Sequence, residues 1–376
     1  MSATWTKNDT RCMERALELA QRGLFEVAPN PLVGAVIVDA NGHIVGSGWH
    51  ENFGGPHAEV NAFNRVNAED KKRLHDSTWY VTLEPCNHTG QTPPCTDLIA
   101  RHKPRRVVVA TVDPNPLVSG KGIRRLRSLG IQVDVGCKEA EALWQNRRFI
   151  WAMKHQKPWV VLKWASTVDG FLDPRLSHQR TAKSGGVAIT GEQARATTHR
   201  WRAEEMGILI GVQTALVDEP ALNVRESKGR NPQRFVLDPH HRLPDSHSLF
   251  QETASQTKAI RIVSTDAAGS ENDQHCRWNQ QEGISGLLHR LHTDYTINSL
   301  LVEGGAHTLN SFIAAGQWNE LKRWTSPQVS EQGLLAPTKP HNAVLPPFGE
   351  HDGMAGEDRW DHWIHTDSIE SLKESR

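Results

Sequence analysis

One histidine, two cysteines and one glutamate near the start of the chain have the side chains needed for metal-assisted hydrolysis. His57 and Glu59 stand in the segment PHAEV, and Cys86 and Cys95 stand in TLEPCNHTGQTPPC. A catalytic zinc ion usually takes three protein ligands and leaves a fourth position for water. His57, Cys86 and Cys95 supply that number of ligands, and water bound there would lose a proton near neutral pH. The pattern predicts a zinc site with Glu59 beside it as an acid–base group.

Each of these residues could also have an ordinary structural role. A lone histidine is usually a surface or hydrogen-bonded residue, and two cysteines nine positions apart are more often buried thiols. The combination is more specific, because His-Ala-Glu opens an expected helix and each cysteine follows a proline. It matches the H-x-E … P-C … C arrangement of zinc nucleobase deaminases, in which the glutamate moves protons and does not bind the metal. The departure is the gap of eight residues between the cysteines, where the usual motif has two.

Length and composition limit the class of protein. A chain of 376 residues is long for one compact domain and suits two. Its 43 basic and 43 acidic residues give a net charge of zero, which gives no support to a nucleic-acid-binding protein. The chain has no apolar run of roughly 18 residues and a polar N-terminal segment, so neither a membrane span nor a signal peptide is expected. Five scattered cysteines do not form a disulfide framework, so we expect a cytoplasmic protein.

The first part of the chain alternates helix and strand patterns. We expect a hairpin at Leu32–His50 around the Asn41-Gly42 turn. Further strands are expected at Ser77–Glu84, Arg105–Asp113 and Ile131–Gly136. Helices are expected at Thr10–Gly23, Val60–Val66, Pro94–Arg101, Gly122–Gly130 and Glu139–Gln156. This alternation predicts a layered α/β sheet with helices packed on its faces.

A second α/β series follows a boundary that we place near Lys157-Pro158. Strands are expected at Trp159–Ser166, Met206–Gly211, Arg234–Asp238, Lys258–Ser264 and Ile297–Gly305. Helices are expected at Gly191–Glu205, at Gly286–His292 and after Gly305. The segment Ser264–Gly283 is interpreted as a polar loop, and no clear closing strands are visible after Pro327.

Four segments of the first part together resemble the deaminase half of the bifunctional riboflavin-biosynthesis deaminase/reductase. They are NPLVGAVIV, PHAEV, TLEPCNHTGQTPPC and DPNPLVSGKGIRRLRSLGIQV, within residues 8–150. The long loop between the two cysteines is the norm in that family. The resemblance implies a cytidine-deaminase-like three-layer αβα domain, with Zn²⁺ on the three ligands and Glu59 as proton shuttle. It also implies a substrate pocket lined by Asn30, His50, Asn87 and His88. Asn30 is otherwise a turn residue, and His88 a loop residue in solvent.

A second carboxylate, Glu84, stands two residues before Cys86. We expect it to brace the loop through backbone amides rather than to transfer protons.

Most of residues 159–327 resemble the reductase half of the same family, a dihydrofolate-reductase-like α/β domain. The segments are LKWASTVDG, the stretch from Ala188 to Arg225, FVLD and LLVEGGAHTLNSFI. The resemblance implies an NADPH site at Ala165, Thr190, Thr214, Asp218, Gly304 and Gly305. It implies a site for the phosphorylated substrate at Lys163, Arg202, Leu222, Arg225 and Glu303.

Several of these second-half residues could equally have ordinary structural roles. Arg202 can be a solvated helix residue, Arg225 a surface charge, Asp218 a turn residue and the Gly-Gly pair a tight turn. Two departures also weaken the match. Ala188 stands where the family often has tryptophan, and an insertion-like segment, DPRLSHQRTAKSGG, precedes it.

The resulting hypothesis is a bifunctional enzyme with a deaminase domain at residues 1–152 and a reductase domain at residues 157–376. It would deaminate 2,5-diamino-6-ribosylamino-pyrimidinone 5'-phosphate hydrolytically and then reduce the ribosyl group to ribityl with NADPH. We expect a homo-oligomer, a dimer or tetramer, that binds neither nucleic acid nor membrane. Three alternatives stay open: a zinc deaminase with a silent or weakened second domain, a nucleic-acid deaminase, and a structural zinc protein without catalysis.

Overall fold

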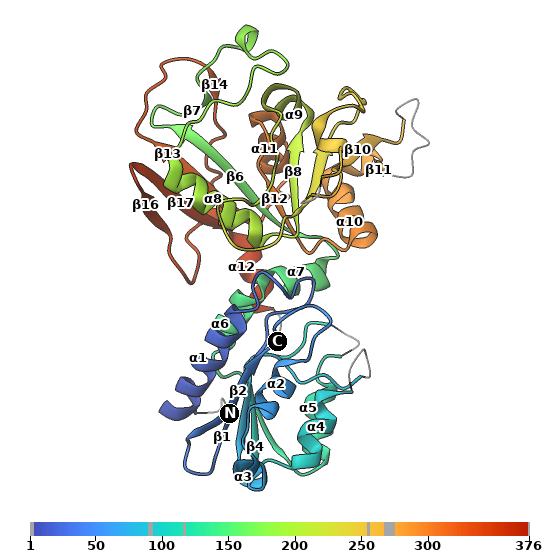
Figure 1. The fold of residues 1–376 in the computed structure, drawn as a ribbon, viewed down its shortest axis with the longest axis vertical. Helices are drawn as coiled ribbons and strands as arrows, with labels where there is room; N and C mark the ends of the chain where they lie inside the picture. Colours follow the sequence, from blue (N-terminus) through green and yellow to red (C-terminus); the bar gives the residue numbers. More distant parts are fainter. Residues whose placement is uncertain (1–3, 89–92, 116–117, 254–255, 267–274, 375–376) are drawn as a thin grey trace. The chain divides into compact units, whose positions relative to one another are not determined.

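The computed structural model describes residues 4–88, 93–115, 118–253, 256–266 and 275–374, which form two compact units (Figure 1). The first unit comprises Met1–Lys154 with Ser371–Arg376, and the second comprises His155–Glu370. Among the described residues, no helix is both long and apolar enough to pass through a membrane. Residues 89–92, which belong to the expected loop between the two cysteines, lie outside the described residues.

The first unit is built on a five-stranded sheet with the strand order β2-β1-β3-β4-β5. Its strands are β1 (Gly34–Val38), β2 (Ile44–Trp49), β3 (Thr78–Val81), β4 (Arg106–Val109) and β5 (Gln132–Val135). Its helices are α1 (Lys7–Gln21), α2 (Ala58–Asn64), α3 (Ala68–Lys71), α4 (Cys95–His102), α5 (Lys121–Ser128), α6 (Glu139–Gln145) and α7 (Arg147–His155). β1 runs antiparallel to β2 and β3, whereas β3, β4 and β5 are parallel. The expected hairpin and the α/β alternation are thus confirmed.

Alternating side chains of the central strands fill two separate cores, one on each face of this sheet. In β1, Ala35 and Ile37 pack with α2, α4 and α5, whereas Val36 and Val38 pack with α1 and α6. Successive strand residues point to opposite faces, so a strand that is buried along its whole length needs helices on both. The first unit therefore has the expected three αβα layers.

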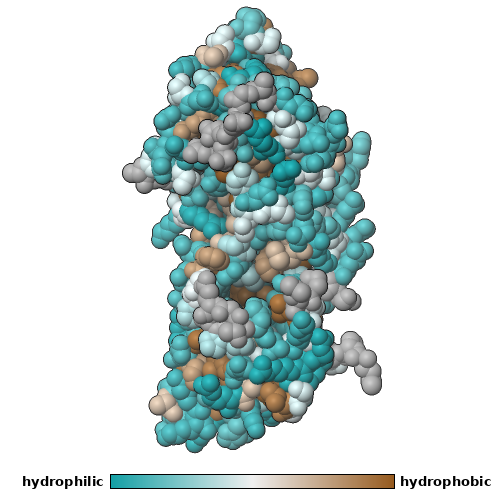
Figure 2. All heavy atoms as spheres, turned by 90° about the vertical axis from the view of Figure 1, so that its right-hand side faces the viewer, coloured by the Kyte–Doolittle hydropathy of each residue, from teal (hydrophilic) through white to brown (hydrophobic). Residues whose placement is uncertain are grey.

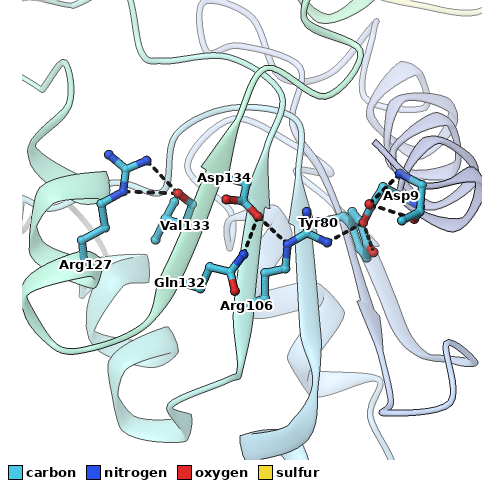
Figure 3. Close-up of polar contacts among 8 residues, drawn as sticks. Asp9, Tyr80, Arg106, Arg127, Gln132, Val133 and Asp134 are labelled. Atoms are coloured by element: carbon cyan, nitrogen blue, oxygen red, sulfur yellow. Dashed lines mark hydrogen bonds and ion pairs between the residues drawn. The ribbon is translucent and has the colours of Figure 1, made fainter. Parts of the chain in front are cut away.

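A buried acidic residue ties α1 to the sheet (Figure 3). Asp9 accepts hydrogen bonds from Tyr80 Oη at 2.8 Å and from Arg106 Nη1 at 2.7 Å. It also closes a capping box with Thr6 at the start of α1. Arg106 in turn donates from Nε to Asp134 Oδ2 at 2.6 Å, so it lies between two carboxylates. Burial by itself raises the pKa of Asp9, but these hydrogen bonds and the Arg106 charge outweigh it and lower the pKa.

Asp9→Asn is expected to destabilise the first unit by about 2–3 kcal/mol, because the change removes the charge that faces half-buried Arg106. Tyr80→Phe removes only one hydrogen bond and should cost about 1 kcal/mol. Because the pKa of folded Asp9 is lowered, its contribution is present above about pH 4 and is lost as the pH falls. The free energy of unfolding of both variants is measured by urea titration, in which hydrogen exchange of β3 and β4 peptides reports the unfolding of the first unit. An unchanged urea midpoint for Asp9→Asn would show that Asp134 alone is enough to pair the Arg106 charge.

The second unit is built on a ten-stranded sheet with the order β11-β10-β9-β8-β12-β6-β13-β17-β15, in which β16 also pairs with β17. Its long strands are β6 (Trp159–Thr167), β8 (Gly207–Gly211), β9 (Gln233–Leu237), β10 (Ile260–Ser264), β11 (His275–Trp278), β12 (Ser299–Val302), β13 (Glu320–Ser326) and β17 (Asp358–His365). The shorter strands are β7 (Phe171–Asp173), β14 (Leu334–Leu335), β15 (Ala343–Val344) and β16 (Asp352–Ala355). The helices are α8 (Glu192–Glu204), α9 (Val212–Asp218), α10 (Gly283–Tyr295), α11 (Ala306–Ala314) and α12 (Thr366–Lys373).

The middle of this sheet is parallel from β11 through to β13, and β17 runs antiparallel beside β13. Alternate residues of β6, such as Leu162 and Trp164, pack with α10 and α11 in the main core. On α8, Trp201 stacks on Trp324 of β13, with ring centroids 5.3 Å apart. The carboxyl ends of neighbouring parallel strands lie at one edge of a sheet, which is where ligands bind in open α/β sheets.

Two sequence-based expectations for this unit were wrong. The described part of the expected polar loop, residues 264–266 and 275–283, contains β11, whose Cys276 and Trp278 point into the main core. The tail after Pro327 forms β14 to β17 and then α12. These strands escape detection because two of them have only two residues, and because β17 is rich in charged residues and histidine.

The surface carries scattered hydrophobic residues. On the face shown in Figure 2, the coloured residues are mostly hydrophilic, and hydrophobic ones form small separate patches. Exposed apolar side chains include Ile44, Phe53, Val168, Val329 and Met354. Single exposed apolar residues are normal on folded proteins, so this pattern does not by itself mark an interface.

Candidate active sites

The three expected metal ligands converge in the first unit. The ligand atoms of His57, Cys86 and Cys95 all lie within 4.8 Å of one another. His57 Nδ1 lies 3.5 Å from Cys86 Sγ and 3.3 Å from Cys95 Sγ. Zinc bonds of about 2.1 Å to nitrogen and about 2.3 Å to sulfur, at tetrahedral angles, place these atoms about 3.6 Å apart. One nitrogen and two sulfur donors at this spacing therefore fit a zinc ion.

Two helix starts position these ligands. His57 occupies the position directly before α2, and Cys95 is the first residue of α4. The Cys95 backbone N–H also donates to Cys86 Sγ, at 3.3 Å. Hydrogen bonding from Cys95 lowers the pKa of Cys86, although burial opposes it, and His57 adds to the lowering. The same hydrogen bond and burial raise the pKa of Cys95. These surroundings favour a thiolate at Cys86, and a bound metal would favour thiolates at both positions.

Glu59 lies beside the ligands in the first turn of α2, where its side chain is buried. Burial raises the pKa of Glu59 to about 7, and the neighbouring Cys86 adds to this shift. A cation bound by the three ligands would lower the pKa of Glu59. A carboxyl group that titrates near the working pH is suited to take up and release a proton.

A cavity of about 290 Å³ opens onto this cluster. Asn30 and His50 line it, as expected, and the Asn30 Nδ2 lies 3.1 Å from His50 Nε2. His50 Nδ1 lies 3.1 Å from the carbonyl oxygen of Pro56. A carbonyl can only accept, so Nδ1 carries the proton and Nε2 accepts from Asn30. Burial lowers the pKa of His50, which keeps this neutral form.

Asn87 and His88 lie differently with respect to the cavity. His88 lines it, whereas Asn87 is absent from its lining. The Oδ1 of Asn87 accepts from Thr96 Oγ1 at 3.0 Å and from Arg125 Nη1 at 2.9 Å, so this side chain holds the base of the loop. A substrate contact by Asn87 or His88 remains a prediction.

The expectation for Glu84 is confirmed. Its carboxylate accepts four backbone N–H bonds, two of them at 2.8 Å, from Asp113, Gly120, Gly122 and Ile123. These donors lie at the end of β4 and the start of α5, so Glu84 braces that corner of the cavity.

Several cavity residues were not predicted. Asp113 and Asn115 follow β4, and Phe149 and Met153 come from α7. Burial raises the pKa of Asp113. The signal available for Asp113 and Asn115 was their place in DPNP directly after a buried strand, where site residues of α/β folds gather. For Phe149 and Met153 of α7, the only signal in the sequence was their spacing of four residues, which places them on one face of a helix.

In the second unit, two turns at the carboxyl ends of adjacent strands bring three expected cofactor residues together. β8 leads into α9 at Gly211, and β12 leads through Gly304 and Gly305 into α11. A Cβ on Gly304 would lie 2.5 Å from the Ile210 Cα, and one on Gly305 would lie 3.0 Å from Thr214 Oγ1. Glycine, which has no Cβ, allows the two turns to come this close. Backbone N–H groups at the start of a helix are suited to binding phosphate. The arrangement fits a dinucleotide.

The expected substrate residues Arg202 and Glu303 bind each other. Arg202 Nε and Nη2 each donate to one Glu303 oxygen at 2.7 Å, and Nη1 donates to the Asn223 carbonyl at 3.2 Å. Burial by itself raises the pKa of Glu303, but the charges of Arg202 and Lys163 outweigh it and lower the pKa to about 2. Burial lowers the pKa of Lys163. The structure thus forms a largely buried charge cluster from the middle of β6, the end of β12 and α8.

Leu222 and Arg225 flank Asn223, whose carbonyl accepts from Arg202. Leu222 is buried with a positive φ of 54°, and the Arg225 backbone N–H donates to His199 of α8 at 3.3 Å. The Arg225 side chain is exposed and lies 3.5 Å from Glu226.

The remaining expected cofactor residues are spread over several elements. Asp218 ends α9 and lies 3.9 Å from Arg175, and its pKa is raised by burial. Ala165 packs near Trp201 and Trp324. Thr190 is half-buried just before α8, and Ala188 is exposed. A cofactor contact by any of these residues remains a prediction.

Fold and site together define a class of protein. A three-layer αβα unit with a His-Cys-Cys cluster and a buried glutamate is a zinc-dependent deaminase domain of the nucleobase type. The second unit is a parallel α/β domain with glycine turns at its ligand-binding edge.

Comparison with known proteins identifies the family. Residues 6–111 match the model of the cytidine and deoxycytidylate deaminase zinc-binding region, and residues 158–329 match that of the RibD C-terminal domain. The riboflavin biosynthesis protein RibD of Aquifex aeolicus is 39% identical over 329 residues, which cover 87% of this chain and 89% of that protein. RibD of Escherichia coli is 36% identical over 349 residues, which cover 85% and 88%.

Solved structures agree over nearly the whole length. Acinetobacter baumannii RibD superimposes with a TM-score of 0.81 at 32% identity, covering 96% of this chain and 99% of that one. A diaminohydroxyphosphoribosylaminopyrimidine deaminase/5-amino-6-(5-phosphoribosylamino)uracil reductase from Thermotoga maritima gives a TM-score of 0.79 at 32% identity, covering 95% and 99%. The chain belongs to the RibD family of riboflavin biosynthesis proteins. It is a bifunctional enzyme with a deaminase domain and a dihydrofolate-reductase-like reductase domain.

Proposed function

We propose that this enzyme deaminates 2,5-diamino-6-ribosylamino-pyrimidinone 5'-phosphate and then reduces the ribosyl group of the product to ribityl with NADPH. The observation that carries the first reaction is the His57, Cys86 and Cys95 cluster with buried Glu59 at the cavity. We assign deamination to residues 1–152 and reduction to residues 157–376. We also propose that the protein acts in the cytoplasm as a homo-oligomer.

The deamination step follows from the cavity. Zn²⁺ held by His57, Cys86 and Cys95 would supply Lewis acidity that makes a water acidic near neutral pH. Glu59 takes one proton from that water as its oxygen adds to the amino-bearing ring carbon, and passes it to the adjacent ring nitrogen. The same carboxyl then takes the remaining hydroxyl proton and gives it to the departing amine, which leaves as ammonia while the ring carbonyl forms. Asn30 and His50 hold the ring in place from the cavity wall.

In the second unit, NADPH would be held at Ala165, Thr190, Thr214, Asp218, Gly304 and Gly305 and would supply a hydride. The pair Arg202 and Glu303, with Lys163, Leu222 and Arg225, would position the phosphorylated sugar. The cationic groups of Lys163, Arg202 and Arg225 would attract the phosphate. The supporting observations are the close approach of the two glycine turns and the charge cluster beside them.

Metal analysis and two assays test this function. We expect one zinc per chain, and His57→Ala should lose it because two thiolates alone bind zinc poorly at neutral pH. Ammonia release from the diamino substrate should disappear with the zinc, whereas NADPH oxidation on the deaminated substrate should persist. His88→Ala, which changes another cavity histidine, should keep the metal. Metal-free wild-type protein that releases ammonia at full rate would refute the assignment.

A further inference from the structure

Asn146 is a buried residue between α6 and α7 that uses its whole side chain to bind the backbone of one distant residue. It is 3% exposed. Its Oδ1 accepts from the Leu32 N–H at 2.8 Å, and its Nδ2 donates to the Leu32 carbonyl at 2.9 Å. In a sheet, the backbone N–H and C=O groups of a residue bind a neighbouring strand. At Leu32, the Asn146 carboxamide binds both groups instead. Residues 31–33 have no regular secondary structure, so this clamp fixes their position.

The clamped segment carries one wall of the deaminase cavity. Asn30 lies two residues before Leu32, and both Asn30 and Pro31 line the cavity. The Asn30 side chain holds His50 at 3.1 Å, and His50 holds the Pro56 carbonyl at 3.1 Å. The backbone from Leu32 to Asn30 and the two hydrogen bonds of His50 thus connect Asn146 to Pro56, the residue that precedes His57.

The same residue also places a second part of the cavity lining. The Ile150 N–H donates to the Asn146 carbonyl at 2.9 Å, so Asn146 opens the first turn of α7. Asn146, Phe149 and Met153 are spaced at i, i+3 and i+7, which puts them on one helix face. Phe149 and Met153 line the cavity that Asn30 lines. Holding Leu32 therefore holds this helix face against the Asn30 segment.

We propose that Asn146 is a positioning residue for deamination, which sets the distance between the Asn30–His50 wall and the Phe149–Met153 wall. This inference rests on the proposed function. The hydrogen bonds of the Asn146 side chain go to Leu32, and not to a metal ligand or to Glu59. Its loss should weaken the binding of the pyrimidine more than the chemical step.

Two variants test the clamp. Asn146→Ala removes both hydrogen bonds, and Asn146→Asp keeps the size of the side chain but sets a carboxylate against the Leu32 carbonyl. For both, we expect the KM for ammonia release from the diamino substrate to rise about tenfold and kcat to stay within about threefold, the signature of lost uniform binding. Zinc content and NADPH oxidation on the deaminated substrate should not change.

A matched control stands in the second unit. Asn319 is 2% exposed, and its Oδ1 accepts from the Val160 N–H at 2.8 Å. Asn319→Asp should leave the KM for ammonia release unchanged, because it alters a similar buried asparagine that belongs to the other unit.

The possible outcomes separate the two proposals. An unchanged KM in both Asn146 variants would overturn the positioning role. Equal losses of deamination, zinc and NADPH oxidation would also overturn it, because they would show a general structural role. Absence of ammonia release from the zinc-loaded wild type would instead refute the proposed function, and this inference with it.

Discussion

Glu59→Gln is expected to lower the kcat of deamination by about 10³-fold and to leave the zinc content at one per chain. Glutamine keeps the size of the side chain but can neither take a proton from water nor give one to the departing amine, and a positioned acid–base group contributes about 10²–10⁴ in rate. Glu59 is buried in the first turn of α2, beside the ligands and at the cavity. Ammonia release at saturating substrate, with metal analysis of the same samples, measures the effect.

Glu51→Gln is the matched control for this change. Glu51 belongs to the same unit but is exposed and lies 2.5 Å from Arg65 at the surface. Exposed ion pairs contribute little, so this variant should keep both activities. Glu59→Gln with an undiminished kcat would show that another group moves the protons, and the proposed mechanism would be wrong.

Local patterns predicted most of the first unit. Asn41-Gly42 forces a tight turn, and Gly42 has the positive φ of 83° that the turn requires. Strands such as β4 are short apolar runs that need no distant partner to be recognised. β11 is different, because His275–Trp278 becomes a strand only by pairing with β10 in parallel. β17 likewise depends on β13, and neither partner can be inferred from its own sequence.

The residues of the candidate sites also divide into those that a local pattern predicts and those that only the fold brings together. His57, Glu59, Cys86 and Cys95 could be predicted, because zinc chemistry limits which residue types can serve and two helix starts hold them. Asp113, Phe149 and Met153 have no such chemical mark, and only the folded chain brings β4 and α7 to one cavity. For Asn87, the structure shows a side chain engaged by Thr96 and Arg125, and the expected contact with substrate remains a prediction.

Glu303→Gln is expected to destabilise the second unit by about 3–5 kcal/mol, because it leaves Arg202 and Lys163 as largely buried cations without a carboxylate. NADPH oxidation on the deaminated substrate should fall at least about 100-fold, since Arg202 loses the partner that fixes its side chain beside the proposed substrate site. The pKa of Glu303 is lowered to about 2, below its value in the unfolded chain. Its contribution to stability is therefore complete above about pH 5 and is lost as the pH falls toward 2.

Two further variants show whether the pair itself is responsible. Arg202→Met combined with Glu303→Gln removes both charges of the pair and should recover part of the stability but none of the activity. Asp361→Asn breaks another arginine–carboxylate pair of the same unit, in which Arg323 Nη2 lies 2.8 Å from Asp361 Oδ2, and should keep NADPH oxidation. Urea titration followed by the hydrogen-exchange protection of β6 and β12 peptides measures stability. If Glu303→Gln matched Asp361→Asn in activity, the charge cluster would serve only the fold, and the substrate phosphate would have to bind elsewhere.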